Sequence, residues 1–477
     1  MVNFFKTHNP LRIFLLLIIL CIIRGSFLLK GVPLIVPELY WKLIGEKIAG
    51  GAVMYKDVWV LLEPLSAGFY RLFAGLQNPY SGLKMASIAL VLFQAFFFNF
   101  LCNNNNLFNR KTFFPALFYI IFSNLFFDFL TTPPVLLGLC FLLPALHLII
   151  IQVRLKLNDQ SMLLTGILIA LASLFFLPFI AFLLIFLITL PFFVAATFRR
   201  YLLLFLGFLL PFLLTILYYF YQNGANTFFA HFLFPYFLTS TNHFIELKFI
   251  GLILLLPIIS SFLGIWMALF FSNYINYQFK IFKLMLVWLL AGVIAFLLST
   301  RFAPSQLYTL VPAFAYFSTH YFLLQRKKLF AEIVFWVILL GVFCLATGFL
   351  YGFPGKIGKP EIAKQLIVQQ AKVLPPISLK GKKIVVLGYD PALYRESMLA
   401  TPYLNWELAK KQFSRLDNFQ AISIIYRNFQ TDLPDVIIDE EQVMPKVFKR
   451  IPILEEQYMQ RGNGVWVLKP SSAIKDE

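Results

Sequence analysis

Acidic residues are scarce in this sequence, and charge of either sign is low. The 477 residues include 22 Asp and Glu against 40 Lys and Arg, and charged residues make up only 13% of the chain. Soluble domains typically carry about a quarter charged residues, so this composition excludes an ordinary soluble protein. Hydrophobic residues reach 60%, with 58 phenylalanines. We therefore predict a mainly α-helical, polytopic transmembrane helix bundle.

Cysteine is also rare, and the sequence contains no N-x-S/T sequon. The cysteines are Cys21, Cys102, Cys140 and Cys344, and each lies inside an apolar run. There they are expected to pack as small hydrophobic side chains, so the sequence predicts neither disulfides nor a thiolate metal site. The missing sequons favour a bacterial inner membrane over a secretory compartment.

Long apolar runs predict about eleven membrane spans. The first is interpreted as a retained helix, because it lacks a small-residue cleavage site and Arg24 lies near its far end. The fifth and sixth runs could be one pair hinged at Pro178 or a re-entrant segment. The predicted spans are Leu11–Leu29, Leu83–Leu101, Phe113–Leu130, Val135–Val153, Met162–Leu177, Phe179–Ala196, Tyr201–Tyr221, Phe249–Phe271, Leu284–Ser299, Leu307–Leu324 and Phe330–Tyr351.

Basic residues fall in alternate loops and orient these spans. The loops between them are nearly free of Lys and Arg, apart from Arg301. This positive-inside pattern predicts a cytoplasmic N-terminus and an extracytoplasmic C-terminal region. It also assigns the net charge of +18 to a membrane surface and not to a nucleic-acid partner. The basic residues are Arg110 and Lys111, Arg154 and Lys156, Arg199 and Arg200, Lys280 and Lys283, and Arg326, Lys327 and Lys328.

The composition changes after Tyr351, where the apolar runs end. Residues 352–376 mix Gly, Pro and Lys, which is typical of a linker with a short helix. Three apolar runs bounded by turn residues then predict strands, namely KKIVVLGY, PDVIID and GVWVLKP. Two segments between them predict helices, namely YLNWELAKKQF and EEQVMPKVFKRI. We predict a transmembrane domain over 1–352, with its first external loop at 31–82, and a linker plus a small extracytoplasmic α/β domain over 353–477.

The external acids are the candidate catalytic residues. The stretch Pro37–Arg71 directly follows the first span and contains Glu38 and Asp57, while Asp128 lies at the outer end of the third run. A carboxylate near a membrane costs free energy unless it is solvated, paired or ligating a metal. The alternative is that these acids are solvated loop residues or partners of nearby bases. Glu46, two helical turns after Glu38, fits that alternative better.

Arg301 is the clear exception among the nearly base-free external loops, in the segment RFAPSQLYTLVP. Its planar guanidinium can form paired hydrogen bonds with a phosphate. The alternative is an interfacial arginine that reaches lipid head groups. His231 and His243 show no metal-ligand spacing and are interpreted as surface or packing residues. GEKIAGG and GKKIVVLG lack the rest of a P-loop or GxGxxG motif and predict no nucleotide site.

These features resemble the first external loop of the GT-C superfamily, membrane glycosyltransferases that use polyprenyl-phosphate-linked sugars. Protein O-mannosyltransferases and lipid A aminoarabinose transferases belong to it. The resemblance rests on Glu38, on GEKIAGGAVMYKD ending at Asp57, and on Glu63–Leu65. RFAPSQLYTLVPAFAY is similar to a later segment of the family, and Asp128 matches the acid of the second external loop.

The resemblance implies an integral membrane glycosyltransferase that moves a sugar from a polyprenyl-phosphate-linked donor to a protein, glycan or lipid acceptor on the extracytoplasmic side. It implies Glu38 as the catalytic base and Asp57 as a second acid. Arg301 would bind the donor phosphate, and Asp57 and Asp128 would bind a divalent metal, Mg²⁺ or Mn²⁺. The sequence departs from the family in two ways. A single Glu38 stands where an Asp or an Asp-Glu pair is usual, and residues 305–306 replace a common histidine.

Two other functions compete with this one. A transporter or lipid flippase usually needs ionisable residues near mid-membrane, and the fifth to ninth spans carry essentially none. A non-catalytic scaffold of the same fold, acting in a secretion or envelope-assembly complex, would keep the architecture and lose the chemistry. The single Glu38 keeps this alternative open.

Overall fold

The computed structural model describes residues 1–6, 12–155, 159–193, 197–238, 242–243, 245–271, 274–351, 365–371 and 375–470. The chain packs as two compact units. Unit 1 contains Met1–Pro33, Tyr80–Thr215 and Ser240–Leu366, and unit 2 contains Leu34–Pro79, Ile216–Thr239 and Ile367–Glu477. The first external loop therefore packs with the C-terminal module. The predicted division at residue 352 falls where the described residues stop, and it stays a prediction.

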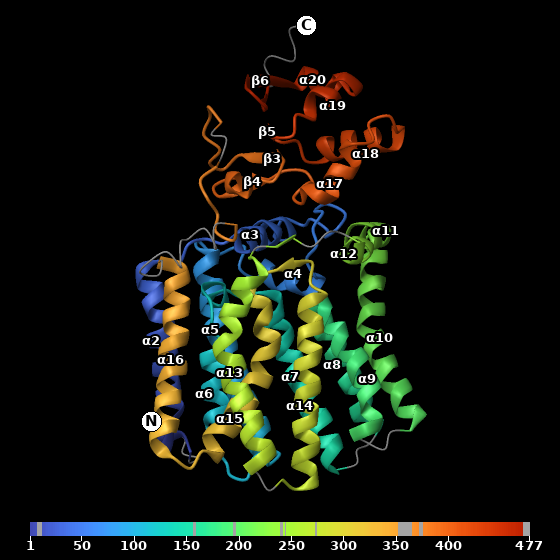
Figure 1. Ribbon diagram of the computed structural model, residues 1–477. Helices are drawn as coiled ribbons and strands as arrows, with labels where there is room; N and C mark the ends of the chain where they lie inside the picture. Colours follow the sequence, from blue (N-terminus) through green and yellow to red (C-terminus); the bar gives the residue numbers. More distant parts are fainter. Residues whose placement is uncertain are drawn as a thin grey trace. The chain divides into compact units, whose positions relative to one another are not determined.

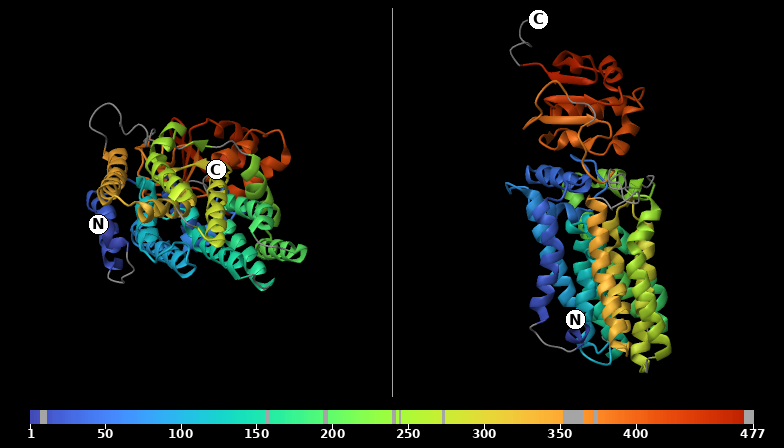
Figure 2. Two further views of the ribbon diagram at one scale, coloured as in Figure 1. Left: turned by 60° about the horizontal axis from the view of Figure 1, so that its bottom comes forward. Right: turned by 60° about the vertical axis from the view of Figure 1, so that its left-hand side comes forward.

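Unit 1 is a bundle of long helices that run side by side (Figure 1; Figure 2). It also contains a short parallel strand pair, β1 Asn242–His243 and β2 Arg301–Phe302. Its helices are α1 Val2–Phe5, α2 Arg12–Lys30, α5 Pro79–Asn104, α6 Phe114–Phe122, η1 Phe127–Leu130, α7 Pro134–Leu155, α8 Asp159–Phe175, η2 Leu177–Phe179, α9 Ile180–Phe193, most of α10 Phe198–Tyr221, α13 Leu247–Phe271, α14 Asn276–Leu297, η4 Pro304–Leu310, α15 Val311–Leu324 and α16 Lys328–Tyr351.

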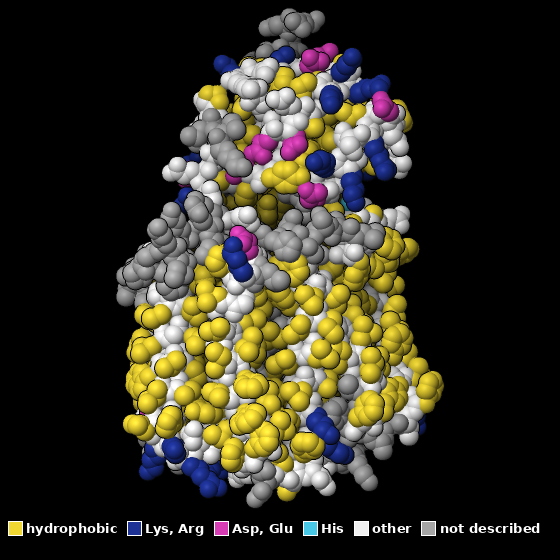
Figure 3. Space-filling view, in the orientation of Figure 1, with side chains coloured by type: hydrophobic (Ala, Val, Ile, Leu, Met, Phe, Trp, Pro, Cys, Tyr) yellow, Lys and Arg dark blue, Asp and Glu magenta, His cyan; other side chains and the backbone are white. Residues whose placement is uncertain are grey.

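Six of the described helices are long and apolar enough to cross a membrane, namely α5, α7, α10, α13, α14 and α16. The face of the bundle in Figure 3 is almost continuously hydrophobic, and Lys and Arg side chains gather at its lower end. Lipid-facing helices with basic cytoplasmic ends have this pattern. The mainly α-helical transmembrane bundle is therefore confirmed, while the count of eleven spans stays a prediction.

The third predicted span is not one continuous helix. Helix α6 ends at Phe122, and a 3₁₀ turn, η1, follows after a short gap. Asn124 explains the break, because its Nδ2 donates to the Ile120 carbonyl at 2.6 Å and so competes with helix continuation. At the fifth and sixth runs the chain is hinged at Pro178, which lies in η2 between α8 and α9. Proline lacks the N–H that a continuous helix would need there.

Glycines allow several helices of the bundle to approach closely. A Cβ added at Gly264 of α13 would lie 1.8 Å from the carbonyl oxygen of Phe317 in α15. A Cβ at Gly166 of α8 would lie 2.1 Å from the Leu204 carbonyl oxygen in α10. Small residues at such crossings let helices pack by van der Waals contact where no hydrophobic driving force acts between them.

Unit 2 is built around a five-stranded mixed sheet in the order β4-β3-β5-β7-β6. β3 is parallel to β4 and β5, and β7 is antiparallel to β5 and β6. This confirms the small C-terminal α/β domain. The elements are α3 Val36–Ala49, α4 Pro64–Arg71, α11 Ala225–Phe228, η3 Phe229–Leu233, α12 Phe234–Leu238, β3 Lys383–Leu387, η6 Pro391–Tyr394, β4 Met398–Leu399, α17 Trp406–Phe413, α18 Phe419–Thr431, β5 Val436–Asp439, α19 Met444–Arg450, α20 Pro452–Gln457, β6 Tyr458–Gly462 and β7 Val465–Leu468.

The first loop is joined to this module by backbone hydrogen bonds and by core packing. The Val368 N–H donates to the Leu34 carbonyl at 2.9 Å, and the Trp59 N–H donates to the Pro402 carbonyl at 2.8 Å. The Trp59 side chain packs in the hydrophobic core of the module, edge-on against Tyr403. The loop that carries Glu38 and Asp57 is therefore held in shape by the C-terminal residues.

Candidate functional site

Glu38 lies in the first turn of α3, where it is completely buried. Pro37 precedes it, and Glu38 Oε2 accepts a hydrogen bond from the Ile35 N–H at 3.4 Å, so the carboxylate caps the helix. Burial raises the pKa of the Tyr70 hydroxyl, and the negative charges of Glu63 and Glu38 raise it further. Glu38 is therefore part of a buried acidic group and not a solvated loop acid.

Asp57 lies in a tight turn that follows α3. Gly51 and Tyr55 have φ of +92° and 67°, in the left-handed region, and reverse the chain. Gly50 does not contribute in this way, since its φ is −75°. Asp57 Oδ2 accepts the Val53 N–H at 2.7 Å, and the Asp57 N–H donates to the Val53 carbonyl at 2.8 Å. The turn thus fixes the partly exposed carboxylate in place.

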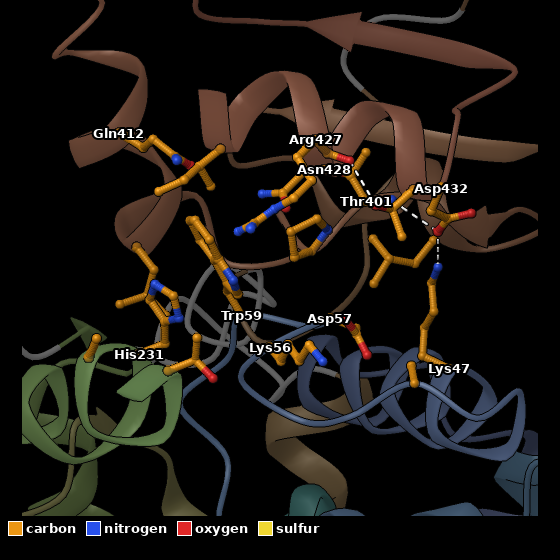
Figure 4. Close-up of a pocket in the computed structure, with 18 of the residues that line it drawn as sticks. Lys47, Lys56, Asp57, Trp59, His231, Thr401, Gln412, Arg427, Asn428 and Asp432 are labelled. Carbon is orange, nitrogen blue, oxygen red and sulfur yellow. Dashed lines mark hydrogen bonds and ion pairs between the residues drawn. The ribbon is translucent and has the colours of Figure 1, made fainter. Parts of the chain in front are cut away.

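Asp57 lines a cavity of about 1090 Å³ whose described lining residues all belong to unit 2. α3 and the turn after it, η3, α17 and α18 form its walls, and Figure 4 shows Arg427, Asn428 and Gln412 opposite Lys56 and Asp57. Glu38 is not among the described residues that line it. Its charged lining residues are the bases Lys47, Lys56, Lys383, Lys411, Arg415 and Arg427 and the acids Glu46, Asp57 and Asp432.

The Trp59 indole lies in the cavity wall and stacks on His231, with ring centroids 4.1 Å apart. His231 Nδ1 lies 3.0 Å from the Tyr55 carbonyl oxygen, and since a carbonyl can only accept, Nδ1 carries the proton. Burial lowers the pKa of His231, which outweighs the opposite effect of this hydrogen bond, so the ring is neutral at pH 7. The prediction of a packing histidine is confirmed for His231. The side chain of His243 lies outside the described residues.

Asp432 joins α3 to the module. Its carboxylate binds Lys47 of α3 and, at 3.0 Å, Lys383 of β3, and Oδ2 also accepts the Thr401 N–H at 3.2 Å. Burial alone would raise the pKa of Asp432, but the two ammonium groups outweigh it and hold the pKa below its usual value. Glu46, by contrast, pairs with Lys42 along α3 at 3.3 Å, as expected for a helix-face residue.

Asp128 and Arg301 belong to unit 1. Asp128 is completely buried in η1, and its Oδ2 accepts the Ser305 N–H at 2.7 Å. The structure therefore brings Asp128 against the segment that begins at Arg301. The backbone of Arg301 pairs with Asn242 in the parallel strands β1 and β2. The Arg301 side chain lies outside the described residues, so its predicted phosphate contact stays a prediction.

Sequence reasoning missed the role of Arg24, which is buried near the end of α2. Its guanidinium donates to Asn124 Oδ1 at 2.8 Å, Ser87 Oγ at 2.9 Å and the Phe129 carbonyl at 3.2 Å, and it lies 3.4 Å from the Tyr308 hydroxyl. These partners come from α5, η1, η4 and the residues after α6. The sequence did contain a signal for this role, since Arg24 is the only basic residue between Arg12 and Lys30, in an otherwise apolar run.

The proposed metal ligands Asp57 and Asp128 fall in separate units. Within the described part of the chain, no group of three or more His, Cys, Asp and Glu side chains is arranged to hold a metal ion. The metal assignment of these two acids therefore stays a prediction.

No protein-family model matches the chain, and no curated protein sequence matches it significantly. The chain is similar in structure to ArnT from Cupriavidus metallidurans bound to undecaprenyl phosphate, with a TM-score of 0.52, 13% identity, and coverage of 96% of this chain and 97% of that one. It also aligns with the archaeal oligosaccharyltransferase AglB from Archaeoglobus fulgidus in complex with an inhibitory peptide and a dolichol-phosphate. There the TM-score is 0.45, the identity 12%, and the coverage 98% and 75%.

The likeness to ArnT runs through both the helix bundle and the C-terminal module. At 13% identity, this likeness shows a shared fold and nothing more. The chain therefore has an ArnT-like fold.

Proposed function

We propose that this chain is an integral membrane glycosyltransferase of a bacterial inner membrane. It moves a sugar from a polyprenyl-phosphate-linked donor to an acceptor on the extracytoplasmic side. The fold supports this most strongly, because 96% of the chain follows ArnT, whose structure holds undecaprenyl phosphate. The basic end of the bundle supports a cytoplasmic N-terminus and an extracytoplasmic C-terminal region.

In this proposal Asp57 is the general base. Its carboxylate is partly exposed, is held by the Val53 N–H and faces the cavity, so an acceptor hydroxyl can reach it. The hydroxyl loses its proton as it attacks the anomeric carbon. Glu38, which the GT-C resemblance favours as the base, is buried and caps α3, and we propose it as the second catalytic acid. We therefore propose the two roles in the opposite order from the one that the resemblance implies.

The leaving phosphate gains negative charge as its bond to the sugar breaks. Arg301 is the proposed donor-phosphate ligand, because a guanidinium matches phosphate oxygens in pairs. Asp128 supports it indirectly by fixing the Ser305 backbone four residues later. A divalent ion at Asp57 or Asp128 remains part of the proposal, and its test is whether chelation reduces transfer.

The test is transfer by the purified full chain. It uses a radiolabelled undecaprenyl-phosphate-linked sugar and a bacterial envelope extract as the source of acceptor. Asp57→Asn keeps the size of the side chain but cannot accept the proton, so it should reduce transfer by about 10²-fold or more. Glu38→Gln keeps the size of the proposed second acid and removes its charge, so it should also reduce transfer. Glu396→Gln, an exposed acid in the same unit, is the control and should leave transfer unchanged.

Two results would count against the proposal. Near-normal transfer in both isosteric variants would remove these acids from the mechanism. A wild-type chain that transfers no sugar from any polyprenyl-phosphate donor would favour the non-catalytic scaffold. In that alternative, Glu38 serves only to cap α3 through the Ile35 N–H.

A further inference from the structure

The cavity of unit 2 is large enough for an extended polar ligand. Its volume of about 1090 Å³ lies slightly above the range of roughly 300–1,000 Å³ typical of small-molecule sites. Side chains from three separate parts of the chain converge on it, from residues 43–59, from 223–235 and from 383–432. The cavity is therefore formed by the tertiary packing of three parts of the chain, and it is not a groove along a single helix.

Positive charge in the lining exceeds what the local acids neutralise. Of the six lining bases, Lys47 and Lys383 bind Asp432. The remaining four form no ion pair within the described residues. Lys411 lies in the last turn of α17, and Arg415 follows two residues after that helix ends. The bases without an acidic partner are Lys56, Lys411, Arg415 and Arg427. Such an excess of positive over negative charge in a concave site attracts anions.

Two buried polar atoms in the wall also lack partners. Thr401 is only 1% exposed, and its Oγ1 makes no hydrogen bond to the described residues. Gln412 Oε1 is likewise buried and without a partner among them. Buried polar groups in native proteins are nearly always satisfied by protein, water or ligand. A ligand with several hydroxyl groups would satisfy both atoms, and the amides of Asn223, Asn418, Gln420 and Asn428 offer further donors and acceptors.

An aromatic ring completes the lining. Trp59 lies in the wall beside these polar groups and stacks on the His231 ring (Figure 4), so that only 5% of it is exposed. Aromatic side chains combine a large apolar surface with a polar tip, which suits a ligand that has both apolar C–H groups and hydroxyls. A negatively charged sugar would complement this lining, because it could bind the bases that lack acidic partners, the unsatisfied polar atoms and the indole.

We propose that this cavity binds an anionic saccharide, a glycan that carries phosphate or carboxylate groups. Its role as the acceptor of the transfer rests on the proposed function. Asp57 lines the same cavity as the four bases, so a glycan held by Lys56 and Arg427 would present its hydroxyls to the proposed base. A soluble glycan and the head group of a glycolipid share this chemistry, and both are included.

Binding is measured by calorimetry on the full chain in detergent micelles. The probes are maltotriose, maltotriose phosphate ester, inorganic phosphate, a lipid-linked form of the same ester, and phosphatidylglycerol vesicles. The ester should bind at least about 10-fold more tightly than maltotriose at moderate salt. The double variant Lys411→Gln/Arg427→Gln should weaken ester binding by about 10-fold and leave maltotriose binding unchanged. The double variant Lys446→Gln/Lys449→Gln removes the same charge from exposed positions of α19 and should change neither.

Several outcomes would overturn the proposal. The first two are equal affinity for the ester and for maltotriose, and equal losses of ester affinity in the two double variants. The other two are inorganic phosphate that binds as tightly as the ester, and binding to the vesicles alone. Tighter binding of the lipid-linked ester would support the proposal and identify a glycolipid; tighter binding of the free ester would support it and identify a soluble glycan.

The binding assay needs no transfer, so the two proposals can fail separately. An inactive chain that still binds the ester would end the proposed function and keep this site. An active chain whose KM for acceptor is unchanged in Lys411→Gln/Arg427→Gln would overturn this site alone.

Discussion

Arg24 offers a sharp test of what holds unit 1 together, because its described hydrogen-bond partners are all neutral. Three of its donor contacts are 3.2 Å or shorter, to Asn124, Ser87 and the Phe129 carbonyl. Hydrogen bonds between membrane helices contribute about 0.6 kcal/mol on average and up to about 1.7. A charged donor lies at the upper end of such ranges. Arg24→Met keeps an apolar stem and removes every donor, so it should cost about 3–5 kcal/mol of unfolding free energy.

Arg24→Lys separates charge from geometry. An ammonium keeps the positive charge but cannot reach partners on four segments with the planar fork of a guanidinium, so we expect about half the loss, roughly 2 kcal/mol. Unfolding of the purified chain in mixed micelles, followed by circular dichroism against SDS mole fraction, measures both. Arg326→Met, an exposed loop arginine, is the matched control. If Arg24→Met stays within about 0.5 kcal/mol of wild type, these contacts do not stabilise the bundle.

Two further predictions concern packing and pH. Gly264→Ala should cost about 1–3 kcal/mol in the same assay, because the new Cβ meets the Phe317 carbonyl oxygen, whereas Gly251→Ala on the same helix has open space and should cost nothing. Asp432→Asn should lower the stability of unit 2 by about 1 kcal/mol at pH 7, because it removes the ion pairs with Lys47 and Lys383. The folded-state pKa of Asp432 is depressed, so its contribution is present above the unfolded pKa and lost as pH falls through the folded one. In thermal unfolding, the difference in stability between the wild type and Asp432→Asn should become smaller below about pH 4. A difference at pH 3 equal to that at pH 7 would contradict this.

Much of the fold could be predicted because apolar runs and basic loops are strong signals in a membrane protein. Every predicted span contains helical residues, and the predicted strands at KKIVVLGY, PDVIID and GVWVLKP match β3, β5 and β7. Helix α18 was not predicted, although Ala421, Ile425 and Phe429 are buried at four-residue intervals. The short strand β4 carries too few residues to show a period, and its pairing with β3 depends on a contact distant in sequence.

The site was harder to predict, because its residues are brought together by tertiary packing. Sequence spacing singled out Asp57 but gave no reason to connect it with Arg427, which lies beyond the whole helix bundle along the chain. Glu38 was identified by its position after the first span, yet neither its burial nor its cap on the Ile35 N–H can be read from that position. Pairing of Asp128 with the Ser305 backbone likewise follows from packing alone.

The shared core of the first loop and the C-terminal module has a consequence for biosynthesis. Trp59 leaves the ribosome early, but Tyr403 and Pro402, which complete its surroundings, follow only after the helices of unit 1. At about 5–20 residues per second, the loop waits tens of seconds for its partner. During that interval its apolar residues are exposed and its turn at Asp57 is unsupported. A nascent chain stalled before Trp406 would therefore carry a helix bundle with an unformed unit 2, open to proteases and chaperones until translation of the module is complete.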